Sequence, residues 1–130
     1  MEIKRFDLLE VELSGAKGSE QDKVRPCVVI QNDIGNRFSP TTLVMPLTHV
    51  IKNLNQPTHA LIKLEDAIGL RTDSMIVAEQ TRTVDKCRII KKIGGLTSDK
   101  AKEEAIKVYF ANVMGEKYIP DSMVCLNGGQ

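Results

Sequence analysis

The chain has 130 residues, of which 42% are hydrophobic and 27% charged, and its formal net charge is +1. These values are typical of one soluble globular domain and exclude a disordered or fibrous chain. The near-neutral net charge excludes a strongly basic protein. The longest apolar runs are too short to span a bilayer.

The amino-terminal residues lack the apolar region of a secretory signal, so we expect a cytoplasmic protein. The three cysteines, Cys27, Cys87 and Cys125, are odd in number and have no metal-ligand spacing. Cys27 begins an apolar run and is expected to pack as a small hydrophobic residue. We therefore predict a reducing compartment and neither a metal nor another cofactor.

Six segments have the alternation or the β-branched content of strands. They cover residues 6–13, 24–30, 41–48, 58–64, 74–81 and 84–90. Pro46 predicts a bend or an edge position in the third strand, because proline cannot donate a hydrogen bond to a neighbour. Residues 14–23 and 32–40 are rich in turn-forming residues and are predicted as loops.

The strongest helix signal covers residues 99–114, with Thr97 or Ser98 as its cap and Gly115 at its end. An apolar stripe at helical spacing is expected to pack on the core or to form a partner surface; it comprises Ile106, Tyr109, Phe110 and Val113. Many short strands and one late helix predict a mainly β protein with helices, a small, strongly bent antiparallel barrel followed by a carboxy-terminal helix. Residues 1–115 form the single expected domain, and residues 116–130 form a tail that is partly ordered or flexible.

Two strand ends have the chemistry of an anion site. Arg25 begins one predicted strand, and Pro26 favours an extended backbone at Arg25, so the guanidinium should project from the strand's start. Thr48 ends the next strand with a hydroxyl that both donates and accepts hydrogen bonds. A permanent positive charge and a hydroxyl together suit a phosphodiester. The alternatives are a surface salt bridge from Arg25 to Glu20 or Asp22, and an ordinary strand threonine.

Two further features leave structural and functional interpretations open. His49 and His59 have the pKa range of general acids and bases, but the arginine–hydroxyl pair does not require them. We expect His59 to hydrogen-bond a backbone carbonyl. Residues 82–92 contain five cations and one carboxylate, which indicates either a solvated face or a rim facing nucleic acid.

Several ordered segments resemble the MazF/PemK/Kid toxins over about residues 4–114. The matching segments are Gly18-Ser19-Glu20-Gln21, Arg25-Pro26, Val29-Ile30-Gln31-Asn32-Asp33, Asn36, Ser39-Pro40-Thr41, Pro57-Thr58-His59, and residues 79–86. The resemblance implies an SH3-like barrel of the CcdB/PemK type. It also implies the toxin of a type II toxin–antitoxin system.

Such toxins are homodimers that cut single-stranded messenger RNA at short sequences without a metal. The 2′-hydroxyl attacks the adjacent phosphorus, which leaves a 2′,3′-cyclic phosphate and a 5′-hydroxyl. The resemblance implies that Arg25 and Thr48 are the catalytic pair. It further implies a MazE-like antitoxin whose disordered segment occupies the RNA groove, DNA binding only through that antitoxin, and no membrane partner.

Recognition of unpaired bases needs amide edges, ring faces and cations along the backbone. The candidate RNA-binding residues are Ser19, Glu20, Gln21, Asn32, Asn36, Phe38, Gln80, Arg82 and Arg88. Two other functions remain as alternatives: a CcdB-like toxin that poisons DNA gyrase without enzymatic activity, and an inert module that only binds peptide or RNA.

Overall fold

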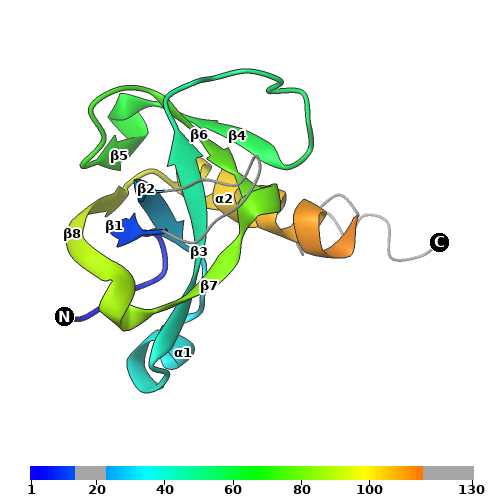
Figure 1. Cartoon of the computed structure of the whole chain (residues 1–130). Helices are drawn as coiled ribbons and strands as arrows, with labels where there is room; N and C mark the ends of the chain where they lie inside the picture. The colour runs from blue at the N-terminus through cyan, green and yellow to red at the C-terminus, as the bar shows by residue number, and fades with distance from the viewer. Residues whose placement is uncertain (14–22, 116–130) are drawn as a thin grey trace.

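Short antiparallel strands make up most of the computed structural model, which describes residues 1–13 and 23–115 (Figure 1). The strands are β1 (Asp7–Glu12), β2 (Val24–Val29), β3 (Thr41–Thr48), β4 (His59–Ile62), β5 (Ala67–Ile68), β6 (Ser74–Val77), β7 (Arg82–Asp85) and β8 (Ile89–Leu96). The helices are α1 (Asp33–Phe38) and α2 (Asp99–Met114), and three 3₁₀ turns are η1 (Leu64–Asp66), η2 (Ala78–Gln80) and η3 (Lys86–Arg88).

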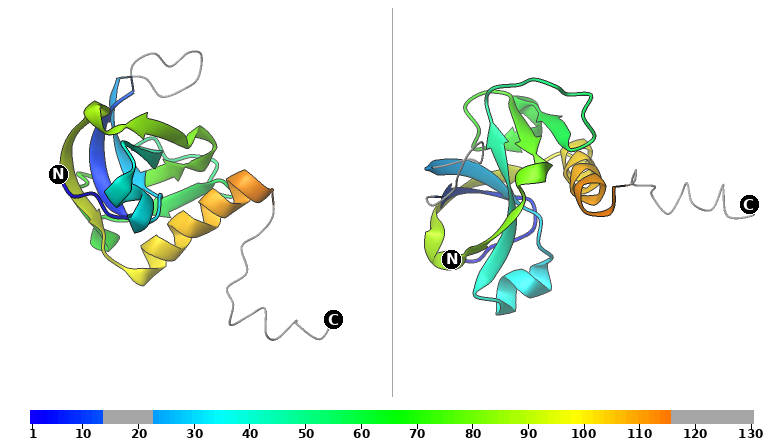
Figure 2. Two further views of the ribbon diagram at one scale, coloured as in Figure 1. Left: turned by 90° about the horizontal axis from the view of Figure 1, so that it is seen from below. Right: turned by 45° about the vertical axis from the view of Figure 1, so that its right-hand side comes forward.

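The strands lie in the order β4-β6-β3-β2-β1-β8-β5, with β7 also paired to β3. Neighbouring strands are antiparallel, and the sheet curls into a nearly closed barrel with α2 packed against one side (Figure 2). Register shifts between β1 and β8 mark irregularities of the kind that bend a sheet. The predicted barrel with a carboxy-terminal helix is therefore confirmed.

β3 is a central strand whose partner changes along its length. Residues Thr41 to Val44 pair with β7, whereas Leu47 and Thr48 pair with β6. Pro46 lies between these two stretches, where its missing N–H leaves no gap in either ladder. The bounds predicted for β3 are confirmed, but the strand is not at an edge of the sheet.

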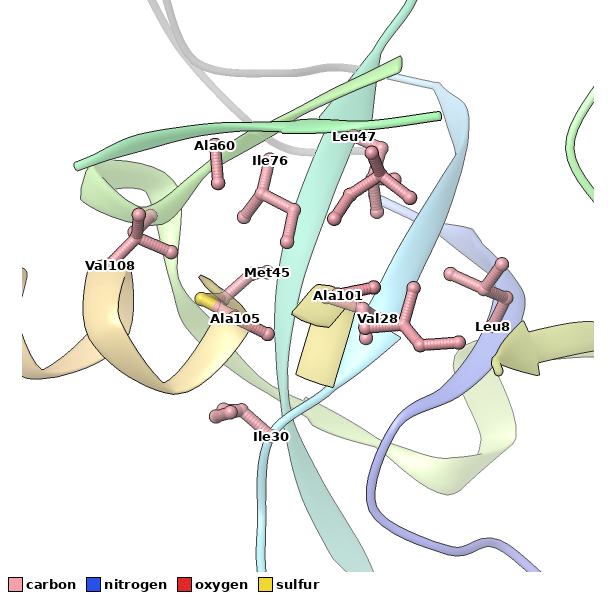
Figure 3. Close-up of a cluster of buried hydrophobic side chains, with 13 residues drawn as sticks. Leu8, Val28, Ile30, Met45, Leu47, Ala60, Ile76, Ala101, Ala105 and Val108 are labelled. Carbon is pink, nitrogen blue, oxygen red and sulfur yellow. The ribbon is translucent and has the colours of Figure 1, made fainter. Parts of the chain in front are cut away.

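Alternate residues of the same strands contribute to two hydrophobic clusters. Leu8 and Val28 belong to the cluster that packs under α2 (Figure 3), while Leu9 and Cys27 belong to a second cluster on the opposite face. Because successive side chains of a strand point to opposite faces, β1 and β2 are buried on both sides. The expectation that Cys27 packs as a core residue is confirmed.

α2 begins and ends where the sequence predicts. The Ser98 Oγ accepts a hydrogen bond from the Ala101 N–H at 3.0 Å, and Gly115 ends the helix with a φ of 66°. The expected packing of the apolar stripe on the core is confirmed for Ile106 and Tyr109, which are partly buried against it. The buried residues of α2 are Ala101, Ala105 and Val108, whereas Val113 is 55% exposed. Small alanine side chains let the helix approach the sheet closely, so the larger residues lie at the flanks of the contact.

Three predicted boundaries were wrong for local reasons. The predicted loop 32–40 contains α1, which Asn32 caps by accepting from the Gly35 N–H at 2.8 Å. The strand predicted over 74–81 ends at Val77, where η2 begins, and that over 84–90 is interrupted by η3. Asp85 caps η3 by accepting from the Cys87 N–H. One- and two-turn helices are too short to show a hydrophobic period.

None of the helices in the described segments is long and apolar enough to cross a membrane.

Candidate functional site

Arg25 and Thr48 lie at the open end of the β2–β3 pair. Cys27 is opposite Pro46 in this antiparallel register, and extending the register by two residues sets Arg25 opposite Thr48. Side chains two residues apart on a strand share a face, so both residues point to the side occupied by Cys27. Arg25 and Thr48 are each half-buried. The fold therefore brings the two predicted catalytic residues to one place.

Arg25 lines a pocket of about 630 Å³. The other lining residues are Glu10, Pro26, Leu47, His49, Gly69, Leu70, Arg71, Thr72, Ser74, Lys91 and Ile93. Between residues 1–13 and 23–115, no carboxylate is within ion-pair distance of the Arg25 guanidinium. The alternative salt bridges to Glu20 and Asp22 lie outside the described residues. Arg25 thus borders a space large enough for a small ligand, and the pocket's Pro26 and Leu47 belong to the sheet face opposite the Thr48 side chain.

The Thr48 hydroxyl is already oriented by the backbone that follows it. Its Oγ1 accepts a hydrogen bond from the Val50 N–H at 3.1 Å. A hydroxyl has one donor hydrogen and two acceptor positions, so this contact leaves the O–H free to donate. Thr48 can therefore donate to an anionic oxygen without losing its anchor.

Arg82 approaches the same face from β7. It pairs with Val44, and it lies close enough to Cys27 to lower the thiol's pKa, as Arg25 also does. Burial is the larger influence and raises the pKa of Cys27 to about 12. The thiol is therefore protonated near neutral pH and excluded as a nucleophile, while Arg25 and Arg82 form a pair of cations around it.

Gln80 and Arg88 lie on the segments next to Arg82. Gln80 is half-buried in η2, which packs beside β3, and Arg88 donates to the Glu12 carbonyl at 3.4 Å. Both residues therefore belong to the half of the barrel that contains Arg25. Ser19, Glu20 and Gln21 are candidate RNA-binding residues that lie outside the described residues.

Asn32, Asn36 and Phe38 are grouped at the other end of the β2–β3 pair, on and before α1, away from Arg25 (Figure 1). The Asn36 side chain is buried, with Oδ1 accepting from the Thr42 hydroxyl at 2.7 Å and Nδ2 donating to the Gln31 carbonyl at 2.9 Å. Phe38 is 75% exposed, and Arg37 lies over its ring. These three RNA-binding candidates therefore lie on or beside α1, apart from Arg25 at the start of β2, and their contact with RNA stays a prediction.

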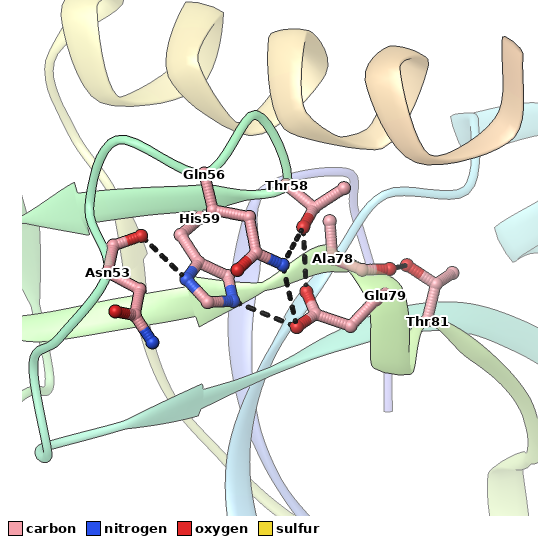
Figure 4. A network of polar contacts seen from close by, with 7 residues as sticks. All are labelled: Asn53, Gln56, Thr58, His59, Ala78, Glu79 and Thr81. Atoms are coloured by element: carbon pink, nitrogen blue, oxygen red, sulfur yellow. Dashed lines mark hydrogen bonds and ion pairs between the residues drawn. The ribbon is translucent and has the colours of Figure 1, made fainter. Parts of the chain in front are cut away.

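The two histidines have different surroundings. His49 is exposed and lines the pocket of Arg25. His59 is held on both ring nitrogens: Nδ1 contacts the Asn53 carbonyl at 3.0 Å and Nε2 contacts Glu79 Oε2 at 2.8 Å (Figure 4). Burial would raise the pKa of Glu79, but hydrogen bonds from His59 and Thr58 outweigh it and lower that pKa. The carbonyl contact expected for His59 is confirmed.

Arg71 and Lys91 are the pocket residues that sequence reasoning missed. Arg71 follows a glycine in a turn-like segment, where a single arginine gives no signal. Lys91 belongs to the basic segment 82–92, but the sequence does not give the strand register, which sets Lys91 opposite Glu10 and on the sheet face of Pro26. No cluster of three or more metal-ligating side chains occurs among the residues that the structure describes.

The fold and the site define a small barrel that presents arginine and a hydroxyl to an anionic ligand. Residues 4–109 match the model of the PemK-like, MazF-like toxins of type II toxin–antitoxin systems. The Endoribonuclease EndoA of Bacillus subtilis is 46% identical over 114 residues, covering 85% of this chain and 97% of that protein. The chain therefore belongs to the PemK-like, MazF-like toxin family, as its resemblance to the MazF/PemK/Kid toxins predicted.

Solved structures agree with this fold at low sequence identity. MazF from Deinococcus radiodurans gives a TM-score of 0.73 at 16% identity, covering 89% of this chain and 99% of that one. An endoribonuclease from a mycobacterial species was solved in complex with its cognate antitoxin. It gives a TM-score of 0.71 at 14% identity, covering 90% of this chain and 99% of that one.

Proposed function

We propose that this chain is the endoribonuclease toxin of a type II toxin–antitoxin pair, and that it cuts single-stranded messenger RNA at short sequences. The observation that carries the proposal is that Arg25 and Thr48 each lie two residues beyond the Cys27–Pro46 pair, at one end of β2 and β3, with Arg82 on the same face. The family match and the name of the Bacillus subtilis relative support it. Neither supports the gyrase-poisoning alternative.

In the proposed reaction, the 2′-hydroxyl of the RNA loses its proton and attacks the adjacent phosphorus in line. A bond forms between the 2′-oxygen and phosphorus, and the bond from phosphorus to the 5′-oxygen breaks. The 5′-oxygen takes up a proton, so the products are a 2′,3′-cyclic phosphate and a 5′-hydroxyl. The nucleophile belongs to the substrate, and no metal is needed to generate it.

Arg25 stabilises the negative charge that develops on the phosphate oxygens. Its guanidinium stays protonated and donates two parallel hydrogen bonds, which suits a phosphate but makes it a poor proton carrier. Thr48 donates to one of the same oxygens or relays a proton, while Val50 fixes its position. His49, which directly follows Thr48 in the chain, is a candidate for either proton transfer.

The two groups of predicted RNA-binding residues take different roles in this proposal. Gln80, Arg82 and Arg88 accompany Arg25 and contact RNA near the cleaved bond. Asn36 holds α1 to β3 through its buried amide instead of contacting RNA. Asn32 is committed to capping α1.

We assign the chain the partners expected of its family: a second copy in a homodimer, and a MazE-like antitoxin with a disordered acidic segment. That segment binds over Arg25 and Arg82 and excludes RNA, and DNA is contacted only through the antitoxin. A structure of MazE–MazF from Deinococcus radiodurans is among the similar structures, with a TM-score of 0.64 at 14% identity. The cytoplasm, where messenger RNA is translated, is the compartment that this function requires.

Replacing Arg25 tests the proposal. Arg25→Ala removes a preorganised donor and should lower kcat on a mixed-sequence RNA in EDTA by about 10²–10³, with an unchanged circular dichroism spectrum. Arg37→Ala, an exposed arginine on α1, is the matched control and should keep full activity. A folded Arg25→Ala protein that cuts as fast as the parent would disprove the assignment. Growth arrest that persists in Arg25→Ala would favour the gyrase alternative.

A further inference from the structure

We propose that a groove beside α2 binds the chain's own carboxy-terminal segment, and that Tyr118 and Ile119 are the residues that enter it. Residues 116–130 lie outside the described residues, whereas the groove lies within them. Binding of this segment goes beyond the proposed ribonuclease function and does not depend on it.

The groove has a volume of about 670 Å³ and lies between α2 and the loop that precedes β4. Its lining residues are Leu54, Asn55, Gln56, Pro57, Thr58, His59, Glu104, Lys107, Val108, Ala111 and Gly115. The lining residues of α2 are spaced as one face of a helix, so they form a stripe that runs to the helix end. The volume falls in the range of sites that bury a small ligand, about 300–1,000 Å³.

The loop wall of the groove is held in place by hydrogen bonds. The Gln56 N–H donates to the Asn53 carbonyl and the His59 N–H donates to the Gln56 carbonyl, each at 3.0 Å. Glu79 joins the same loop to η2 through its contacts with Thr58 and His59 (Figure 4). Asn53 has a φ of 56°, a left-handed conformation that asparagine adopts more readily than most residues. The wall is therefore preformed, which lowers the entropic cost of binding a segment against it.

The lining of the groove offers no unpaired charge to a nucleic acid. Glu104 Oε1 and Lys107 Nζ lie 4.0 Å apart on one turn of α2, so their charges largely neutralise each other. The His59 ring is hydrogen-bonded on both nitrogens. Leu54, which is 42% exposed, and Pro57 supply apolar surface. An apolar segment of low charge therefore fits this groove better than RNA or a strongly acidic peptide.

The residues that follow α2 have this apolar character, and they begin at the groove. Gly115 lines the groove and ends α2 with a φ of 66°, the left-handed conformation that terminates many helices. Tyr118 and Ile119 follow closely enough that an extended chain places them within about 10–14 Å of Gly115. Ile119 precedes Pro120, a sequence that favours an extended backbone. Covalent attachment gives the segment a high effective concentration, so contacts of modest strength are enough to bind it.

Trypsin cleavage of the full chain after Lys117 tests the proposal, because Lys117 is the only lysine or arginine in residues 116–130. Mass spectrometry follows the release of residues 118–130. Ala111→Gln fills the groove with a larger polar side chain and should speed this cleavage about 10-fold, since cleavage follows the population of the open form. Asn112→Gln, at the exposed next position of α2, is the matched control and should be cleaved at the parent's rate. Leu54→Ser, on the loop wall, should speed cleavage as Ala111→Gln does, and it provides the test if Ala111→Gln fails to fold.

Amide chemical shifts from nuclear magnetic resonance give the second readout. Tyr118→Ser/Ile119→Ser should shift the amides that line the groove and leave those of α1 unchanged. Val124→Ser/Leu126→Ser removes two apolar side chains from the same segment and is the control. It should leave the groove amides where they are in the parent.

Equal trypsin rates in the parent, Ala111→Gln, Leu54→Ser and Asn112→Gln would overturn the proposal. Protection of Lys117 that falls on dilution would also overturn it, because the groove would then hold the segment of a second copy. Groove amides that respond to a 2′-O-methyl RNA but not to the Tyr118/Ile119 substitutions would assign the groove to the substrate instead.

Discussion

The side chain of Glu79 connects two segments around the active-site half of the barrel. It accepts from Thr58 at 2.9 Å and contacts His59 at 2.8 Å, and so joins the loop that follows Thr48 to η2 (Figure 4). These hydrogen bonds lower the pKa of Glu79 despite the opposing effect of burial. A carboxyl whose pKa is lower in the folded state stabilises the fold above its unfolded pKa, and that stabilisation is lost as the pH falls through the folded value.

Glu79→Gln should therefore lower the melting temperature at pH 7. The difference from the parent should shrink at an acidic pH below the folded pKa of Glu79, where the parent's carboxyl is itself protonated. Thermal unfolding followed by circular dichroism at both pH values measures this. Glu103→Gln, on an exposed part of α2, is the control and should change little at either pH. An equal decrease in melting temperature at both pH values would mean that the negative charge of Glu79 does not stabilise the fold.

Close contact between β8 and the segment after β5 is the element-scale feature on which the pocket depends. Gly94 pairs with Leu8 of β1, while its Cα faces the Ile68 carbonyl on the other side. A methyl group there would meet backbone atoms, which cannot rotate away as a side chain could. Gly95 is the natural comparison, because a Cβ there would lie 3.4 Å from its nearest neighbour, the Phe6 carbonyl oxygen.

Gly94→Ala should destabilise the protein by roughly 1–3 kcal/mol, a typical cost of overpacking. Gly95→Ala should destabilise it clearly less. Urea denaturation gives the free energy of unfolding of both variants. Equal stabilities for the two variants would show that the β8 contact is looser than described.

At the element scale, the sequence predicted β3 and α2 well, because a β-branched strand and a capped helix leave local patterns. It missed α1, whose six residues are too few for a hydrophobic period. The positions of Arg25 and Thr48 were predictable because each lies at an end of a recognisable strand, whereas their assignment as a catalytic pair came from the resemblance to the MazF/PemK/Kid toxins. The position of Arg71 was not predictable, because it depends on the packing of Gly69 against Ile93 of β8, and these two residues are far apart in the sequence.

At the scale of the whole molecule, large apolar side chains remain exposed on separate strands of the barrel. Ile68 of β5 is 65% exposed, Ile90 of β8 is 50% exposed and Val24 of β2 is 41% exposed. Singly exposed apolar residues are common on protein surfaces, so these three side chains do not by themselves define an interface. The homodimer is proposed from the family, and we expect its contact to bury apolar side chains of this kind.

Sedimentation equilibrium at micromolar concentrations should give about twice the 14.4 kDa mass of one chain. The mass should change little with salt, because apolar contacts, unlike surface ion pairs, are not screened. A mass of one chain at tens of micromolar would argue against the homodimer. So would dissociation on raising the salt concentration alone.

The change of partner along β3 also affects how such a toxin can diverge. β3 has hydrogen-bonded neighbours on both sides, and its amides should be among the last to exchange with deuterium. Residues 51–57 follow the Val50 N–H that anchors the Thr48 hydroxyl, and they are outside any helix or strand. Insertions there would be tolerated without displacing the hydroxyl, so related toxins could acquire new RNA target sequences while keeping the same cleavage chemistry.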